Sequence, residues 1–252
     1  MNDSNVKNIV ILGGGTAGWM TASLLQKKWQ HLGIKITVVE SPDIGIIGVG
    51  EGSTPLLKVF FDSLEISESE WMPACNATYK NGISFNDWST VSGYESYFHP
   101  FPCSLDFATF GLLYKYSALR RKGLDLLAHP NRFSLMAGLT EKKLAPIPSE
   151  NFPFHFQYGY HFDSVLIGNF LRRRAKEIGV EHIEATVQDV EQNSNGDIKS
   201  LKLNNDQTLS GDFFIDCSGF ASVLLQKTLK VPFLNFAENL FNDSAIAMPT
   251  EI

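Results

Sequence analysis

Asn8-Ile-Val-Ile-Leu12, followed by Gly13-Gly-Gly-Thr-Ala-Gly18 and Trp19, is the stretch of sequence that decides the fold. Its first five residues are rich in β-branched side chains and predict a short buried strand. Apolar residues at helical spacing follow the glycines and predict a helix. A strand, a glycine-rich turn and a helix therefore open the chain in that order.

The glycines have the spacing Gly13-x-Gly15-x-x-Gly18, which is typical of a dinucleotide-binding turn. Gly13 permits the tight turn, Gly15 lets the backbone approach a pyrophosphate, and Gly18 lets the helix pack close to the strand. The helix that begins near Thr16 and Ala17 would direct its free N–H groups and its positive dipole end at the phosphates. These five residues are our first candidate binding residues.

A second strand, Lys35-Ile-Thr-Val-Val39, ends at Glu40, which lies 22 residues after Gly18. An acidic residue at this place can accept hydrogen bonds from the hydroxyl groups of a ribose. Because strand, turn, helix, strand and acid occur in this order, we predict a dinucleotide site in an α/β fold.

The composition is ordinary for a globular protein, with 44% hydrophobic and 19% charged residues. The net charge of −6 argues against a nucleic-acid surface, because no basic stripe is available to neutralise phosphates. We interpret Arg172-Arg-Arg174 as a solvated helix face. Three widely spaced cysteines indicate neither a disulfide framework nor a metal site. With no signal region and no apolar run that could span a bilayer, we expect a cytoplasmic protein without a membrane partner.

Residues 41–55 contain four glycines within eight residues, at positions 45, 48, 50 and 52. Such a segment lets the backbone approach a ligand closely. Ile46, Ile47 and Val49 are too apolar for a free loop, so we predict a strap that lies over a bound ligand. Thr54-Pro55 can open the next helix.

The remaining chain gives elements of both kinds. A strand is predicted around Ile83 and Phe85, and a helix over residues 105–122, whereas residues 124–160 are rich in proline and predict no element. Asp163 can cap a helix that closes at Gly179. Strands are then predicted at 184–190, 198–203 and 212–216, and a further helix passes through Leu224 and Leu229. The last strand runs into Asp216-Cys-Ser-Gly219, a second close-approach turn at the carboxyl end of a sheet.

With these pieces placed, the sequence resembles the flavin-dependent tryptophan halogenases, a branch of the FAD-binding monooxygenase-like proteins. The glycine pattern alone is shared with many dehydrogenases, but Trp19 directly after it, the Gly-Glu-x-Ser/Thr-x-Pro strap and the segment that ends at Lys80 are far more specific. The matching segments are Gly-Gly-Gly-Thr-Ala-Gly-Trp-Met-Thr-Ala (13–22), Ile-Gly-Val-Gly-Glu-Gly-Ser-Thr-Pro (47–55), Asn-Ala-Thr-Tyr-Lys (76–80), Tyr-Phe-His-Pro-Phe (97–101), Tyr-His-Phe-Asp (160–163) and Phe-Ile-Asp-Cys-Ser-Gly-Phe (214–220).

The resemblance implies a Rossmann-like FAD-binding fold of the FAD-dependent monooxygenase type, with a β-meander and an inserted aromatic-rich helical and loop region. It implies that reduced FAD, oxygen and chloride or bromide give hypohalous acid, which reaches a lysine beside the ring of tryptophan or a related indole. By position that catalytic lysine is Lys80. A separate flavin reductase is implied as a partner, because no nicotinamide site is visible, and a homodimer is left open.

Four further roles follow from the resemblance alone. His99 and Phe101 correspond to rings that stack on the indole substrate. Glu51, in the strap, resembles the residue that couples flavin occupancy to the substrate side. Val187 resembles a position whose backbone contacts the adenine of FAD, and an ordinary strand core residue is the alternative for it.

We expect an FAD-binding domain over residues 1–252 that is incomplete at its C-terminus. Its nucleotide-binding core would comprise residues 1–60 and 160–230, and residues 61–159 would form an inserted substrate-side region. The family's Trp-x-Trp-x-Ile-Pro segment, its second catalytic glutamate and its halide-binding turn are absent from these 252 residues. The chain is therefore expected to correspond to roughly the N-terminal half of a family member.

Two other functions remain open. A hydroxylating flavin monooxygenase shares the two glycine-containing turns but does not need Lys80. A truncated, non-catalytic FAD-binding module needs only the nucleotide site. A plain NAD dehydrogenase leaves the strap and the Asp216-Cys-Ser-Gly219 turn unexplained.

Overall fold

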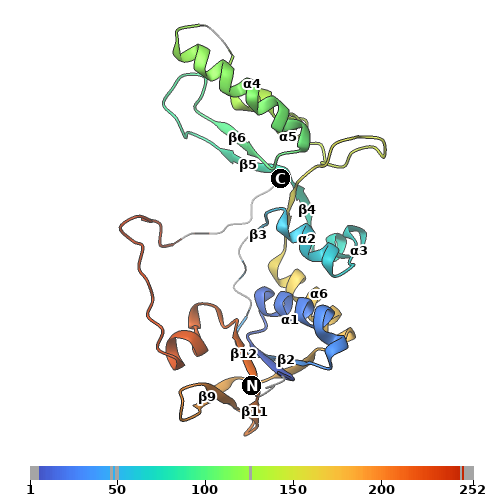
Figure 1. Ribbon diagram of the computed structural model, residues 1–252, viewed down its shortest axis with the longest axis vertical. Coiled ribbons are helices and arrows are strands. Elements are labelled where there is room, and N and C mark those ends of the chain that lie inside the picture. The colour runs from blue at the N-terminus through green and yellow to red at the C-terminus, as the bar shows by residue number, and fades with distance from the viewer. Residues whose placement is uncertain (1–5, 46–47, 49–50, 125–126, 245, 247–252) are drawn as a thin grey trace, which may run out of the picture. The chain divides into compact units, whose positions relative to one another are not determined.

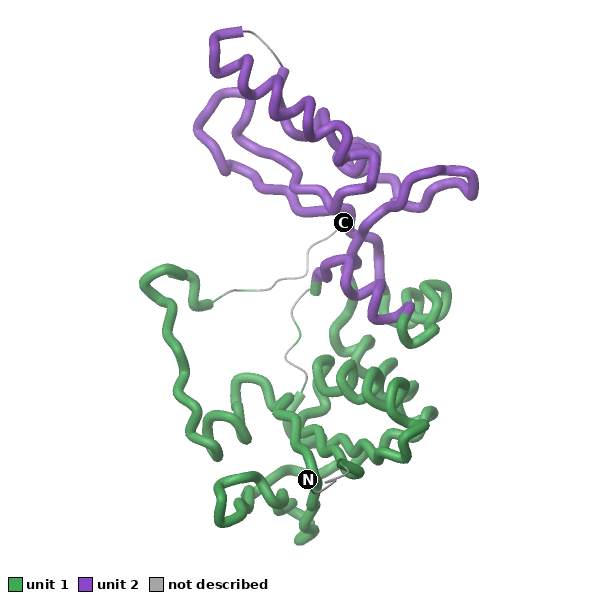
Figure 2. The backbone as a smooth tube through the Cα atoms, viewed as in Figure 1, with its two compact units in different colours: residues 1–51, 63–76, 162–252 green, residues 52–62, 77–161 purple. Residues whose placement is uncertain are grey.

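The chain folds into two compact units. The structure, a computed structural model, describes residues 6–45, 48, 51–124, 127–244 and 246. Unit 1 comprises residues 1–51, 63–76 and 162–252, and unit 2 comprises residues 52–62 and 77–161 (Figure 2).

The centre of unit 1 is a four-stranded parallel sheet in the order β12-β1-β2-β8 (Figure 1). Four of the five residues of β1 are buried, as expected for a strand with a neighbour on each side in a parallel sheet. The predicted first two strands are confirmed. The strands are β1 (Asn8–Leu12), β2 (Lys35–Glu40), β8 (Glu181–Glu184) and β12 (Phe213–Asp216).

Helices α1 (Thr16–Trp29) and α6 (Ser164–Glu177) pack against each other within unit 1. The N-terminus of α6 is capped as predicted, because Oδ1 of Asp163 accepts hydrogen bonds from the N–H groups of Val165 and Leu166 at 2.8 and 2.9 Å. Gly179 follows the helix with a φ of +101°, a left-handed value that favours glycine. The smaller helical elements of unit 1 are η1 (Gln30–Leu32), α3 (Glu68–Ala74), η3 (Gly219–Ala221) and a π-helical turn (Val223–Thr228) that replaces the predicted last helix.

The predicted single strand over residues 184–190 is wrong, because the chain changes sheets within it. β8 ends at Glu184, and the N–H of Ala185 donates to the carbonyl oxygen of Glu40 at 2.9 Å. A new strand then begins at Val187 and pairs in a β-meander. This antiparallel sheet consists of β9 (Val187–Gln192), β10 (Ile198–Leu203) and β11 (Thr208–Ser210).

The meander and the parallel sheet share one hydrophobic core. Val10 and Leu12 of β1 lie in the same buried cluster as Leu201 and Leu203 of β10. Burial of such side chains is the main stabilising contribution to this end of the fold. The three cysteines of the chain are free, and burial raises the pKa of Cys75 to about 11. Across the described parts of the chain, no helix is long and apolar enough to cross a membrane.

Unit 2 contains small sheets and short helices. Its strands form the sheet β3-β7-β4 and the hairpin β5-β6. The predicted helix over residues 105–122 is confirmed as α4. The strands are β3 (Glu51–Gly52), β4 (Thr78–Lys80), β5 (Gly82–Phe85), β6 (Tyr97–Pro100) and β7 (Gly159–Phe162). The helices are α2 (Leu56–Ser63), α4 (Ser104–Arg121), η2 (Pro130–Phe133) and α5 (Leu135–Glu141).

A buried carboxylate joins two of these helices. Asp106 is 1% exposed, and its Oδ2 accepts from the N–H of Cys103 at 2.9 Å, which caps the start of α4. Its Oδ1 accepts from the N–H of Leu135 at 2.8 Å, at the start of α5. The start of α5, in a region for which the sequence predicted no element, is thus held to α4 by a hydrogen bond between positions 29 residues apart.

We expect Asp106→Ala to lower the free energy of unfolding by about 3 kcal/mol, because two buried N–H groups lose their acceptor. Urea denaturation measures this loss. Asp62→Ala is the matched control, since Asp62 forms an exposed ion pair with Lys58 and its loss should cost less than about 1 kcal/mol. Equal effects of the two substitutions would contradict the role given to Asp106.

Candidate functional site

The glycine-rich turn brings three backbone segments into close contact. Gly13 has a φ of +118°, and a Cβ atom there would lie 2.1 Å from the carbonyl oxygen of Cys217. A Cβ atom at Gly18 would lie 1.9 Å from the carbonyl oxygen of Gly13. A Cβ atom at Gly15, in contrast, would meet no described atom within 4 Å. Gly13 and Gly18 therefore permit close packing, and the backbone at Gly15 faces open space.

The first turn of α1 leaves N–H groups for a ligand. Gly15 is the N-cap residue and provides no side-chain cap. Thr16 directs its hydroxyl to the carbonyl oxygen of Ser164 at 3.5 Å, and Ala17 is exposed. Free N–H groups at the positive end of a helix dipole favour an anion. The arrangement fits the pyrophosphate of a dinucleotide.

The turn after β12 is built around Asp216. Its carboxylate accepts hydrogen bonds from the N–H of Ser218 at 3.0 Å and from the N–H groups of Leu224 and Leu225 at 2.8 and 2.9 Å. Desolvation raises the pKa of Asp216, but these hydrogen bonds and one from the Ser218 hydroxyl lower it, and the pKa lies below its ordinary value. This carboxylate fixes the turn that places Cys217 beside Gly13, which is a structural role.

Glu40 lies directly above the glycine-rich turn. A Cβ atom at Gly14 would lie 2.2 Å from Cδ of Glu40, so the glutamate side chain rests on the Gly14 backbone. Oε2 of Glu40 lies 2.9 Å from Nε2 of His182 and 3.5 Å from a guanidinium nitrogen of Arg172. Glu40, which the sequence predicts to bind a ribose, therefore lies at the carboxyl end of β2, and both His182 and Arg172 contact its carboxylate.

Two residues of this arrangement were not found by sequence reasoning. Arg172 was interpreted as part of a solvated face; it is 39% exposed and reaches Glu40 from α6. His182 lies on β8, and its side chain is 8% exposed. Its ring packs edge-on against Trp19 with centroids 5.1 Å apart. The pairing of β2 with β8, which brings residues 142 positions apart together, is the signal that would have found His182.

Burial lowers the pKa of His182, and the charges of Lys176 and Arg172 act in the same direction, whereas the charge of Glu40 opposes them. The folded protein therefore holds this ring neutral, while in the unfolded chain it becomes protonated near pH 6.5. The stabilising contribution is fully present above about pH 6.5 and is lost as the pH falls below it. We expect the free energy of unfolding to fall between pH 7 and pH 5, and less steeply in His182→Phe. An equal slope in both proteins would contradict this expectation.

Glu51 and Val187, the other two residues that the resemblance assigns to the flavin site, each begin a strand. Glu51 is the first residue of β3 and is half-buried. Val187 begins β9, and its side chain packs against the hydrophobic cluster that contains Leu201 and Leu203. Of the strap, Ile46, Ile47 and Val49 lie outside the described residues. A Cβ atom at Gly48 would lie 1.5 Å from Oγ of Ser164, so the strap passes against the start of α6 at this point.

Lys80 ends β4 in unit 2 and is half-buried. It pairs with Gly159 of β7, and its Nζ lies 5.9 Å from the centre of the Phe101 ring. A Cβ atom at Gly52 would lie 2.8 Å from this Nζ and 3.3 Å from Nδ1 of His161. The ammonium group therefore lies near the Phe101 ring and the Gly52 backbone, and His161 borders the same glycine.

The two predicted stacking residues have different surroundings. The Phe101 ring lies near the ammonium group of Lys80, and the backbone N–H of Phe101 donates to the carbonyl oxygen of Asn81 at 2.8 Å. His99 is exposed on β6 and lies edge-on to Phe85 at 6.4 Å. Phe85 in turn stacks on Tyr97 with ring centres 5.1 Å apart. Within unit 2, Lys80 therefore lies near Phe101, whereas His99 lies near Phe85 on the β5-β6 hairpin.

The family model for tryptophan halogenase matches residues 8–252. The chain belongs to the tryptophan halogenase family. The predicted family and the predicted α/β fold, with its Rossmann-like parallel sheet, are thereby confirmed.

Characterised members of the family match nearly the whole chain. Tryptophan 6-halogenase SttH from Streptomyces toxytricini is 34% identical over 98% of this chain and 50% of its own length. Tryptophan 7-halogenase RebH from Lentzea aerocolonigenes is 35% identical over 96% of this chain and 48% of its own length. The chain spans about half the length of the curated relatives it matches.

Solved structures of family members give the same result. The crystal structure of SttH matches with a TM-score of 0.79 at 35% identity, over 94% of this chain and 47% of that structure. A flavin-dependent halogenase from Xanthomonas campestris matches with a TM-score of 0.78 at 34% identity, over 93% of this chain and 46% of that structure.

Proposed function

We propose that this chain carries the flavin-binding turn and the catalytic lysine of an FAD-dependent halogenase that acts on tryptophan or a related indole. The observation that carries the proposal is the position of Lys80, a half-buried residue whose ammonium group lies 5.9 Å from the centre of the Phe101 ring. Family membership supports the reaction class, and the tryptophan halogenases among the relatives support the substrate.

The nucleotide half of the proposal rests on unit 1. The uncapped N-terminus of α1 would bind the pyrophosphate of FAD through its N–H groups, and Gly15 would allow close approach. Glu40 would accept hydrogen bonds from the ribose hydroxyls. Val187 would border the adenine with its backbone, and Glu51 would connect the strap to the substrate side. The half-buried side chain of Val187 also has a packing role.

The chemical half of the proposal rests on unit 2. When bound, reduced FAD supplies the oxidising chemistry that converts chloride or bromide, with oxygen, to hypohalous acid. Lys80 would hold the oxidant by a charge-assisted hydrogen bond and make its halogen more electrophilic. Phe101 and His99 would stack on the flat substrate and select the carbon that meets the halogen. Residues 61–159 would then form the substrate-side region.

The same proposal includes partners. A separate flavin reductase would supply reduced FAD, since the fingerprint in unit 1 accounts for one dinucleotide. Dependence on reduced flavin suits a reducing cytoplasm, and a homodimer is compatible with the proposal.

The test is an assay with reductase-supplied reduced FAD, oxygen, tryptophan, and chloride or bromide. We expect a product with the mass and isotope pattern of a halogenated tryptophan. Flavin turnover without any halogenated product would contradict the proposal and would favour the non-catalytic FAD-binding module.

A further inference from the structure

The contacts of Glu40 define an arrangement that the glycine fingerprint alone does not explain. The carboxylate is only 16% exposed. Its Oε2 faces His182 from β8 and Arg172 from α6, while its aliphatic part rests on Gly14. Within the described part of the chain, both of these ion-pair contacts are made by the same oxygen, Oε2 of the carboxylate.

His182 is itself held in place. Trp19, which is 1% exposed, meets the imidazole edge-on at 5.1 Å. Because burial lowers the pKa of His182, its ring is neutral at pH 7, and an N–H at Nε2 is a donor that Glu40 can use. Oε2 and Nε2 are both buried, and among the described residues neither atom makes an aligned hydrogen bond. The two atoms nevertheless lie only 2.9 Å apart, so a small rotation of either side chain would align them.

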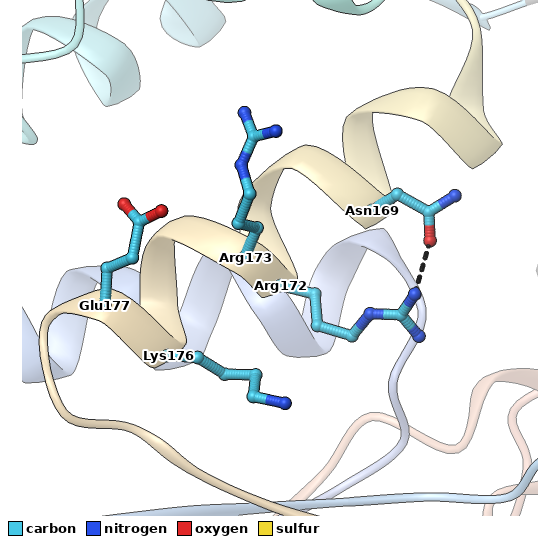
Figure 3. Close-up of a pocket in the computed structure, with 5 residues that line it drawn as sticks. All are labelled: Asn169, Arg172, Arg173, Lys176 and Glu177. Carbon is cyan, nitrogen blue, oxygen red and sulfur yellow. Dashed lines mark hydrogen bonds between the residues drawn. The ribbon is translucent and has the colours of Figure 1, made fainter.

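Arg172 approaches from α6 and is oriented by its own helix. Its second guanidinium nitrogen donates to Oδ1 of Asn169 at 2.8 Å (Figure 3). Figure 3 shows Arg172 and Lys176 extending from the same side of α6, where they line an open pocket of about 500 Å³ with Arg173, Asn169 and Glu177. The guanidinium thus places a positive charge 3.5 Å from Oε2 of Glu40.

We propose that His182 and Arg172 are positioning residues for Glu40: they hold Oε2 so that Oε1 meets the ribose hydroxyls of the adenosine part of FAD, and Trp19 fixes the ring of His182. This inference rests on the proposed FAD site and adds three residues to it. It also gives a physical reason for the tryptophan that directly follows the fingerprint. Trp19 stabilises the ring that holds the ribose acid.

Equilibrium titrations with FAD and with FMN test the proposal, because FMN carries the isoalloxazine and one phosphate but no adenosine. We expect His182→Phe to weaken FAD binding about tenfold, because the Glu40 carboxylate would no longer be held in place to accept hydrogen bonds from the ribose. The same substitution should change FMN binding less than about twofold. In a Glu40→Gln background the same substitution should add less than about twofold, because the two residues act as a unit.

Arg172→Met provides a second variant, since its half-exposed side chain can be replaced without disturbing the core. We expect it to weaken FAD binding about threefold and to leave FMN binding unchanged. Arg173→Met is the matched control: the neighbouring guanidinium lies 5.5 Å from the Phe170 ring, and the substitution should leave both flavins unaffected.

Unchanged FAD binding by the variants would overturn the inference, and so would any one of three comparisons between variants. They are equal weakening of FAD and FMN by His182→Phe, an undiminished effect of that substitution in the Glu40→Gln background, and the same effect from Arg173→Met as from Arg172→Met. A wild-type chain that binds no FAD would overturn the proposed function as well, whereas unchanged FAD binding by the variants would overturn this inference alone.

Discussion

Lys80→Ala is expected to reduce halogenated product by roughly 100-fold or more while FAD binding and flavin oxidation continue. The physical reason is that the ammonium is the group that would hold and polarise the oxidant, and a positioned acid of this kind contributes about 100- to 10,000-fold to a rate. Product is measured by mass spectrometry, and flavin oxidation is followed from the flavin absorbance under the same conditions.

The control for this substitution is Lys115→Ala, which removes an exposed lysine from α4 in the same unit. It should leave product formation unchanged. Lys80→Arg keeps the charge but changes its shape and reach, so we expect it to recover little activity. If Lys80→Ala retained the wild-type rate of halogenation, the lysine would have no part in the reaction.

Gly18→Ala is expected to have the largest effect on stability and to abolish FAD binding. The new Cβ would lie 1.9 Å from the carbonyl oxygen of Gly13, so α1 must move away from the sheet. Overpacking of this kind against backbone should cost about 3 kcal/mol or more. Thermal unfolding of the ligand-free chain measures the loss, and titration with FAD measures binding.

Gly15→Ala separates packing from ligand approach. Because a Cβ at Gly15 meets no described atom within 4 Å, we expect the stability to change by about 1 kcal/mol or less. The same Cβ would occupy space that the pyrophosphate needs, so FAD affinity should fall about tenfold. Equal losses of stability in Gly15→Ala and Gly18→Ala would contradict the roles given to the two glycines.

Local signals were sufficient for much of the fold. β-branched residues before a glycine-rich turn predicted β1, and Asp163 marked the start of α6 through a hydrogen bond to its own helix. These features depend on residues only a few positions apart. In contrast, the sheet change after Glu184 depends on a hydrogen bond to Glu40, which no local pattern contains.

The candidate site likewise contains residues that could be predicted from the sequence and residues that could not. The fingerprint and Glu40 follow from spacing along the chain, and Lys80 follows from resemblance to a family. His182 and Arg172 could not be predicted, because only the order of the strands and the packing of α6 bring them to Glu40. Asp106 is a similar case: its partner on α5 lies 29 residues away in a segment with weak periodicity.

The proposed function requires that the protein transfer a halogen, and not an oxygen atom, to its substrate. The most direct test is to supply bromide and ¹⁸O-labelled oxygen together with reductase-supplied reduced FAD and tryptophan, and to record the product by mass spectrometry. The account predicts a product with the paired isotope peaks of bromine and no ¹⁸O. A product that contains ¹⁸O and lacks bromine would contradict it and would identify a hydroxylating flavin monooxygenase.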